Sequence, residues 1–203
     1  MARRRDPEWT RGQLIEAAFG EMHENGYAAA GVDRIIARSG VTKGAFYHHF
    51  ASKKELAQAV IDSVIRPMVV EAFLAPLGET PDPIDGLQQC LTSQMEHLTP
   101  ERIVCGCPLN NFAQELAGVD DDFQEQIDGL YGHWRDAIAQ ALTRGQEAGQ
   151  VRMDIDPQEV ATFTVAAIAG TAGFAKSARD VEVARTSVRV LCSYLETLRA
   201  PAN

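Results

Sequence analysis

The sequence predicts an all-α protein in which a small N-terminal head of three helices is followed by a longer helical body. Three observations support this fold class. Apolar residues recur at three- and four-residue spacing along most of the 203-residue chain, strand-type alternation is missing, and glycine or proline separates the apolar segments. With 45% hydrophobic and 23% charged residues, the composition is that of a globular protein rather than of a disordered chain.

The head is predicted over residues 1–51 and contains three helices. The first begins at Thr10 and ends at Gly26, and its apolar positions recur at helical spacing. They are Leu14, Ile15, Ala18, Phe19 and Met22. A short second helix ends at Gly40, a residue suited to the left-handed position of a tight turn. Thr42 is then expected to cap the third helix.

The body is predicted over residues 52–203 and is helical throughout. Ser52 and Glu55 form a capping box at the start of a long fourth helix, and Asp156 before Pro157 opens an apolar, Ala-rich helix. Aromatic residues at helical spacing in the body are expected to pack in its core. They are Phe112, Tyr131, Trp134, Phe163 and Phe174.

The net charge of −9 is distributed unevenly. Residues 1–66 hold ten Lys/Arg and eight Asp/Glu, a balance of +2, whereas residues 67–203 hold nine and twenty, a balance of −11. A mildly basic head on an acidic body suits a protein that meets phosphate with one end. Because no apolar run approaches the roughly 20 residues of a membrane span, we expect a cytoplasmic protein with free thiols and no membrane partner.

The second and third predicted helices, joined by a tight turn, form a helix-turn-helix, whose second helix enters the DNA major groove. The start of that helix offers a hydroxyl, a cation and a glycine that lets the backbone approach DNA, while Phe46 and Phe50 are expected to turn inward. The predicted DNA-binding residues are Thr42, Lys43, Gly44, Tyr47, His48 and Lys53. The basic residues 3–5 either form a tail without a role or reach the minor groove or the backbone.

Residues 10–56 resemble the N-terminal domain of TetR-type (TetR/AcrR) transcriptional regulators. The matching positions are Ile15, Ala18, Phe19, Gly26, Tyr27, Ile35, Gly40, Val41, Lys43, Gly44, Tyr47, Phe50, Lys53 and Leu56. This resemblance implies a helical ligand-binding and dimerisation body, a homodimer paired through helices near 157–175 and 182–199, and double-stranded operator DNA as partner. It also implies a repressor released by a small-molecule effector; activation instead of repression stays open. The sequence contains no phosphate-binding glycine loop, nucleophile elbow or recognisable carboxylate pair, so we expect neither an enzyme nor a cofactor. The chain departs from the family at residues 29–31, where Ala-Ala-Gly replaces the usual Ser or Thr cap.

The ligand pocket is expected around residues 105–114. Its predicted lining residues are Cys105, Cys107, Asn110, Asn111, Gln114 and Trp134. Pro108 at the first position of a helix makes Cys107 its N-cap, where the helix dipole favours the thiolate. The two thiols either sense a reactive compound or simply pack beside the pocket. The alternative function is a helical thiol-based redox or metal-binding protein that uses Cys105 and Cys107. A metal site that adds Cys90 and His97 matches no familiar ligand spacing, and neither a metal nor a catalytic site is predicted.

Overall fold

The structure is a computed structural model that describes residues 6–201, and the chain divides into two compact units. The first unit comprises Met1–Pro67 and Asn111–Ile127, and the second comprises Met68–Asn110 and Asp128–Asn203. A stretch from the middle of the sequence therefore completes the N-terminal unit. The predicted domain boundary between residues 51 and 52 stays a prediction.

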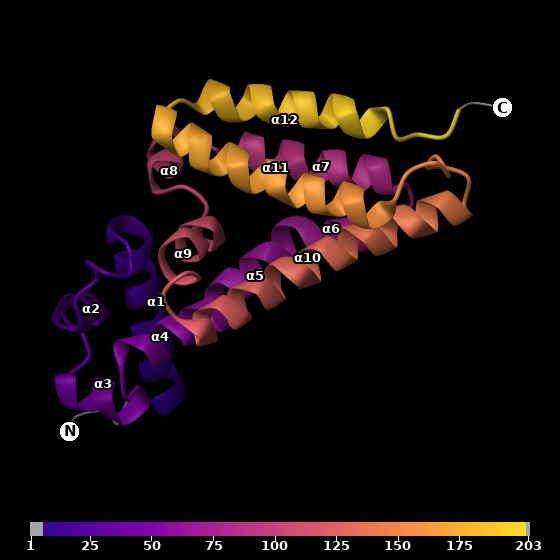
Figure 1. Ribbon diagram of the computed structural model, residues 1–203. Coiled ribbons are helices and arrows are strands. Elements are labelled where there is room, and N and C mark those ends of the chain that lie inside the picture. The colour runs from indigo at the N-terminus through magenta and orange to yellow at the C-terminus, as the bar shows by residue number, and fades with distance from the viewer. Residues whose placement is uncertain (1–5, 202–203) are drawn as a thin grey trace. The chain divides into compact units, whose positions relative to one another are not determined.

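Helices account for the regular structure of the described residues, as the predicted all-α class requires (Figure 1). In the first unit and the segments directly after it lie α1 (Pro7–Asn25), α2 (Val32–Ser39), α3 (Lys43–His49), α4 (Lys53–Val60), the π-helical η1 (Ile61–Ile65), α5 (Arg66–Val69), the π-helical η2 (Val70–Leu74) and α6 (Ala75–Glu79). They are followed by α7 (Pro83–Glu96), α8 (Pro100–Cys105), α9 (Pro108–Leu116), α10 (Asp121–Glu147), α11 (Pro157–Ala178) and α12 (Val181–Glu196).

Local capping chemistry determines where the first three helices begin and end. α1 starts at Pro7, earlier than the predicted Thr10, because the Asp6 carboxylate accepts a hydrogen bond from the first turn. α2 ends at Gly40, which has φ = +64° as the predicted turn requires. The Thr42 hydroxyl caps α3 by accepting from the Ala45 amide at 3.2 Å. The predicted cap and turn residues of the helix-turn-helix are confirmed.

The long helical run after Ser52 contains a feature that the sequence did not predict. The capping box forms: the Ser52 hydroxyl accepts from the Glu55 amide at 3.1 Å, and the Glu55 carboxylate accepts from the Ala51 amide at 2.7 Å. The helix then widens into the π-helical segments η1 and η2 on either side of α5. Pro67, within α5, has no amide to bond back to the preceding turn, and a local widening is one way a helix accommodates this loss.

Aromatic side chains fill the core of the first unit. Phe46 and Phe50 are 0% and 1% exposed, so the prediction that they turn inward is confirmed. Burying a side chain of this size stabilises the fold by about 1.5–3 kcal/mol. The segment Asn111–Ile127 adds Phe123, whose ring meets that of Tyr27 edge-on with centroids 5.5 Å apart.

In the second unit, α12 runs alongside both α11 and α7 (Figure 1). Trp134 is buried as predicted, and its ring lies 4.4 Å from that of Phe73. The core expectation is wrong for Phe163 and Phe174 of α11, which are 52% and 66% exposed. Both residues obey the helical spacing of a core, but they lie on a face of α11 that residues 6–201 leave uncovered.

The apolar character of α11 also corrects the expectation that no segment approaches the length of a membrane span. By length and composition alone, Pro157–Ala178 qualifies as a candidate, with a mean hydropathy of 1.2 over its best window and 28% of that window buried. The core helix of a soluble protein passes the same test, so this property alone is weak evidence for a membrane.

Candidate DNA-binding site

The exposed face of α3 carries the predicted DNA-binding residues. Phe46 is fully buried and fixes the rotation of this two-turn helix. Lys43 and Tyr47 are four residues apart and therefore lie on one side of the helix, where both are exposed, and His48 beside Tyr47 is exposed as well. Tyr47 is 54% exposed although it is a large aromatic residue. Thr42 and Gly44 are also exposed, so the five predicted residues from 42 to 48 share one accessible surface.

Lys43 forms an ion pair inside the helix-turn-helix. Its ammonium lies 2.9 Å from a carboxylate oxygen of Asp33, in the first turn of α2. This hydrogen bond raises the pKa of Lys43, which is therefore fully charged at neutral pH. Both side chains are well exposed, at 62% and 82%, so the pair contributes little and exchange of Asp33 for a phosphate is easy.

Lys53 is less accessible than the sequence suggested. Its ammonium donates to the carbonyl oxygens of Tyr27 at 2.9 Å, Ala30 at 3.1 Å and, more weakly, Ala28 at 3.4 Å. It also lies 4.3 Å from the centre of the Tyr27 ring. An ammonium has three donors, so a direct bond to phosphate requires that it leave at least one of these partners.

The start of α2 lacks the Ser or Thr cap that is usual in the family. Gly31 occupies the N-cap position, and no side-chain hydrogen bond caps the helix. Any phosphate contact at this position must therefore use backbone amides. The basic residues 3–5 lie outside the described part of the chain.

The predicted ligand-binding residues are divided between the two units. Asn111 and Gln114 belong to the first unit, and Gln114 is exposed. The other four belong to the second unit: Cys105, Cys107, Asn110 and Trp134. In that unit Asn110 approaches α11 closely, since a methyl group added to Gly173 would lie 3.4 Å from its amide nitrogen.

Of the two alternatives for Cys107, its surroundings favour a packing residue over an activated thiol. α9 does begin at Pro108, and the amides of Leu109 and Asn110 hydrogen-bond to the Cys107 thiol, as an N-cap geometry predicts. Burial nevertheless raises the pKa of this thiol, because the desolvation of a thiolate outweighs the favourable amide bonds. Burial also raises the pKa values of Cys90 and Cys192. Nothing in the described residues, 6–201, supports the redox alternative.

The metal-binding alternative likewise gains no support from residues 6–201, where no group of three or more His, Cys, Asp or Glu side chains is placed to hold an ion.

Two residues near the site were not predicted. Asp33 pairs with Lys43, and the signal was present in the sequence as an acidic residue in the first turn of one helix and a cation in the first turn of the next. Glu115 bonds to backbone amides of residues 27 and 28. It lies almost ninety residues away in sequence, and no local pattern indicates the contact.

An exposed recognition helix, held by a tight turn on a small helical core and followed by a helical body, defines a DNA-binding transcriptional regulator. Two family models match the chain: "Bacterial regulatory proteins, tetR family" over residues 14–60, and "Tetracyclin repressor-like, C-terminal domain" over residues 83–191. The chain belongs to the TetR family of regulators, whose members are DNA-binding proteins rather than enzymes.

Individual relatives agree with this assignment. The transcriptional regulator AcuR of Cereibacter sphaeroides is 30% identical over 155 residues, which are 73% of this chain and 68% of that protein. The A-factor receptor protein of Streptomyces griseus is 33% identical over 170 residues, covering 84% of this chain but only 56% of the receptor. The crystal structure of a TetR transcriptional regulator from Chloroflexus aurantiacus superposes with a TM-score of 0.84 at 25% identity, covering 96% of this chain and 98% of its own.

Proposed function

We propose that this regulator is a homodimeric repressor that reads a palindromic operator with α3 and is released by a small molecule. The observation that carries the proposal is the accessible surface of α3, on which a cation, an aromatic ring and an imidazole stand clear of the core. A helix of this kind places such side chains against base edges and phosphates in the major groove. The proposed DNA-binding residues are Thr42, Lys43, Gly44, Tyr47, His48 and Lys53.

The proposed homodimer forms through α11 and α12. Phe163 and Phe174 of α11 and Val190 of α12 are all more than half exposed, which is unusual for large apolar side chains. The Phe163 ring packs edge-on against that of Tyr194, so the exposed surface of α11 continues onto α12. A twofold partner on this surface would give two recognition helices about 34–36 Å apart, one turn of DNA.

The proposed effector is a small molecule that binds in the body. The Streptomyces relative is a receptor by name, which supports a ligand-responsive body in this chain as well. The lining residues proposed from the sequence are Cys105, Cys107, Asn110, Asn111, Gln114 and Trp134. A ligand releases DNA only if it binds the DNA-free state more tightly, with a typical coupling of about 1–3 kcal/mol. The same ligand must then bind more weakly when operator is present.

Fluorescence-anisotropy titration against DNA from upstream of the coding region tests the proposal. We expect tight binding that weakens steeply with salt and exceeds binding to unrelated DNA by about 10³-fold or more. Lys43→Ala with Tyr47→Ala should abolish this selectivity, whereas Arg144→Ala, which removes an exposed cation from α10, should retain it. Equal and weak binding to every DNA, across an unbiased selection of sequences, would contradict the proposal.

A further inference from the structure

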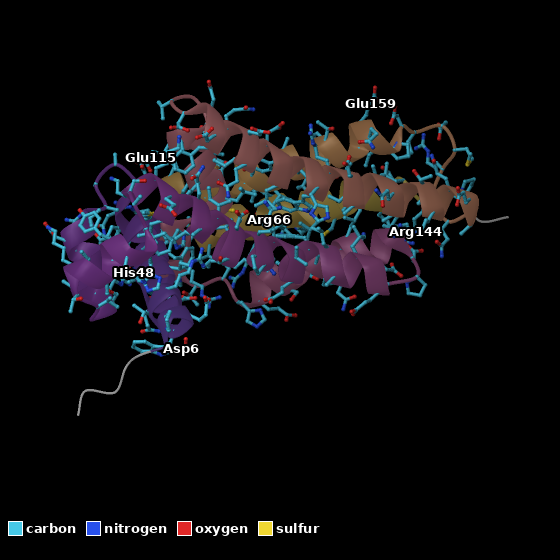
Figure 2. The ribbon with its side chains drawn as sticks, turned by 90° about the horizontal axis from the view of Figure 1, so that it is seen from below. Asp6, His48, Arg66, Glu115, Arg144 and Glu159 are labelled. Atoms are coloured by element: carbon cyan, nitrogen blue, oxygen red, sulfur yellow. The ribbon has the colours of Figure 1, made fainter. Side chains whose placement is uncertain are left out.

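The turn between α1 and α2, residues 26–30, is held by a carboxylate from a distant part of the chain. Glu115 lies on α9, within the segment that completes the first unit. One of its oxygens accepts from the Tyr27 amide at 2.7 Å, and the other accepts from the Ala28 amide at 2.6 Å. Both distances are short, as expected when the acceptor is charged. Figure 2 shows Glu115 and His48 well apart on this unit, so the carboxylate acts away from the exposed end of α3.

The turn is shaped to receive this carboxylate. Gly26 has φ = +83°, a conformation that favours glycine, and it ends α1 by donating to the Met22 carbonyl at 2.8 Å. A Cβ atom at this position would lie 3.2 Å from a Glu115 oxygen, closer than such atoms normally approach. Residue 26 therefore satisfies two demands at once: it turns the chain out of α1, and it leaves room for the carboxylate.

The opposite side of the same turn is held by Lys53. Glu115 binds the amides of the turn, and the Lys53 ammonium binds its carbonyls, from Tyr27 to Ala30. The two side chains thus clamp one short peptide segment through complementary charges. Neither contact is made by a residue near the turn in sequence, so both depend on the tertiary fold of the first unit.

The position of the turn determines where α2 begins. Gly31 is the cap of α2 and provides no side-chain hydrogen bond to that helix, so the start of α2 depends on the residues before it. α2 packs against α1 and α3, and its first turn carries Asp33, the partner of Lys43. A displacement of the turn would therefore move both the helix that supports α3 and the carboxylate that orients its first cation.

We propose that Glu115 is a positioning residue for operator recognition, which acts by fixing the α1–α2 turn and through it the placement of α2 and α3. The inference rests on the proposed reading of an operator by α3. Glu115 makes no contact with DNA in this scheme, so its removal leaves the phosphate contacts in place and changes how well base edges are read. Its effect should fall on the ratio of operator binding to non-operator binding.

The test compares full-length wild type with Glu115→Gln, Glu115→Asp and the control Glu125→Gln. Glutamine keeps the length of the side chain but offers one oxygen where two amides need acceptors. Aspartate keeps the charge and shortens the reach. Glu125 is an exposed carboxylate of α10 in the same unit, so its replacement controls for the loss of one negative charge. Measurements are made where all variants give the wild-type circular dichroism spectrum.

Two readouts are needed: amide hydrogen exchange at residues 27 and 28 by NMR, and affinity for operator and for unrelated DNA. In Glu115→Gln we expect the amide left without an acceptor to exchange about tenfold faster and operator to bind about tenfold more weakly, the effect of losing a charged hydrogen bond. Binding to unrelated DNA should stay within about twofold of the Glu125→Gln control. Glu115→Asp should also lose operator selectivity, because the shorter carboxylate keeps the negative charge but does not reach both amides.

Faster exchange with unchanged selectivity would reduce Glu115 to a structural contact and overturn the proposal, as would unchanged exchange. An equal loss on all DNA would also overturn it. If the wild-type protein itself selects no operator, the proposed repressor function is wrong, and the role of Glu115 is wrong with it. This result is seen before any variant is measured.

Discussion

At the scale of the residue, cations of the two helix-turn-helix elements, α2 and α3, are paired with carboxylates. Arg38 of α2 makes two bonds to Glu24 of α1, at 2.9 and 2.7 Å, and this interaction lowers the pKa of the glutamate. Lys43 pairs with Asp33 in the same way. Exposed pairs of this kind contribute little to stability, so they orient the side chains without opposing DNA binding strongly.

Asp33→Asn should strengthen operator binding. Phosphate must compete with Asp33 for the Lys43 ammonium, and removal of the charge ends that competition while the amide oxygen still orients the lysine. We expect a gain of up to about fivefold, the equivalent of an exposed ion pair. Anisotropy titrations with operator measure the change, with Glu16→Gln on α1 as a control for net charge. Equal gains in the two variants would show that overall charge, and not this pair, limits binding.

Residues whose roles are local were predictable from the sequence. Thr42 and Ser52 cap helices through amides three residues away, and Gly40 adopts the left-handed turn that its neighbours require. The sequence left the role of Cys107 open for the opposite reason: the amides that favour its thiolate are local, but the burial that raises its pKa comes from the tertiary fold.

At the scale of the element, an ionic contact connects the start of α4 to the start of α10. The Lys54 ammonium lies 2.8 Å from Asp120 and 2.7 Å from Asp122. Hydrogen bonds to these carboxylates raise the pKa of Lys54 to about 12, and the bond from Lys54 lowers the pKa of Asp120. Asp120 also caps α10, accepting from the Asp122 amide at 3.1 Å, so one carboxylate serves two elements.

Acid should weaken this connection. A carboxyl with a lowered pKa in the folded state stabilises the fold at pH values above its ordinary pKa of 3.8, and the contribution is lost as pH falls through the lowered value. Lys54→Met should therefore unfold more easily than wild type at pH 6, and the difference should shrink toward pH 2. Urea unfolding at a series of pH values measures it, with Lys43→Met as the comparison. If the difference in unfolding free energy between Lys54→Met and wild type is the same at every pH, the stabilisation does not come from the ion pairs of Lys54 with Asp120 and Asp122.

Helices were predicted correctly where the apolar pattern repeats within their own sequence. Features were missed where a residue far away in the sequence determines the local structure. The boundaries of α2 and α3 follow from their own sequence. The widening at η1 and η2 does not, because the apolar spacing of a π-helical turn differs too little from that of an α-helix over five residues. The bond from Tyr27 to Glu115 joins residues 88 apart, so it emerges only from the fold of the whole first unit.

At the scale of the whole molecule, the uncovered face of α11 is the main departure from the sequence prediction. An apolar helical stripe indicates burial, but composition does not reveal whether the covering surface belongs to the same chain or to a second copy. Phe163 and Phe174 were assigned to the core on this basis and are exposed in the single chain. The proposed second subunit would account for the difference.

Phe174→Glu should convert the proposed dimer to a monomer. A charge at the centre of an apolar interface costs several kcal/mol unless it is paired, which exceeds what a typical contact contributes. Light scattering after size exclusion should give about half the wild-type mass, and operator affinity should fall because one subunit reads one half-site. Met153→Glu, at another exposed apolar position of the second unit, is the control. A dimer of unchanged stability would place the interface elsewhere.

The discontinuous first unit also has a consequence for synthesis on the ribosome. Its N-terminal part ends at Pro67, but the segment that completes it ends at Ile127, so the nascent unit must wait for the intervening chain. At translation rates of about 5–20 residues per second, that delay is roughly 3–12 seconds. During this interval Phe123 and Glu115 have not yet been synthesised or released, so the residues of the head that they contact lack these partners. Force-profile measurements with a translational arrest peptide should show the folding step only after residue 127 has left the exit tunnel; a full-strength step soon after residue 67 emerges would show that the head folds without its second segment.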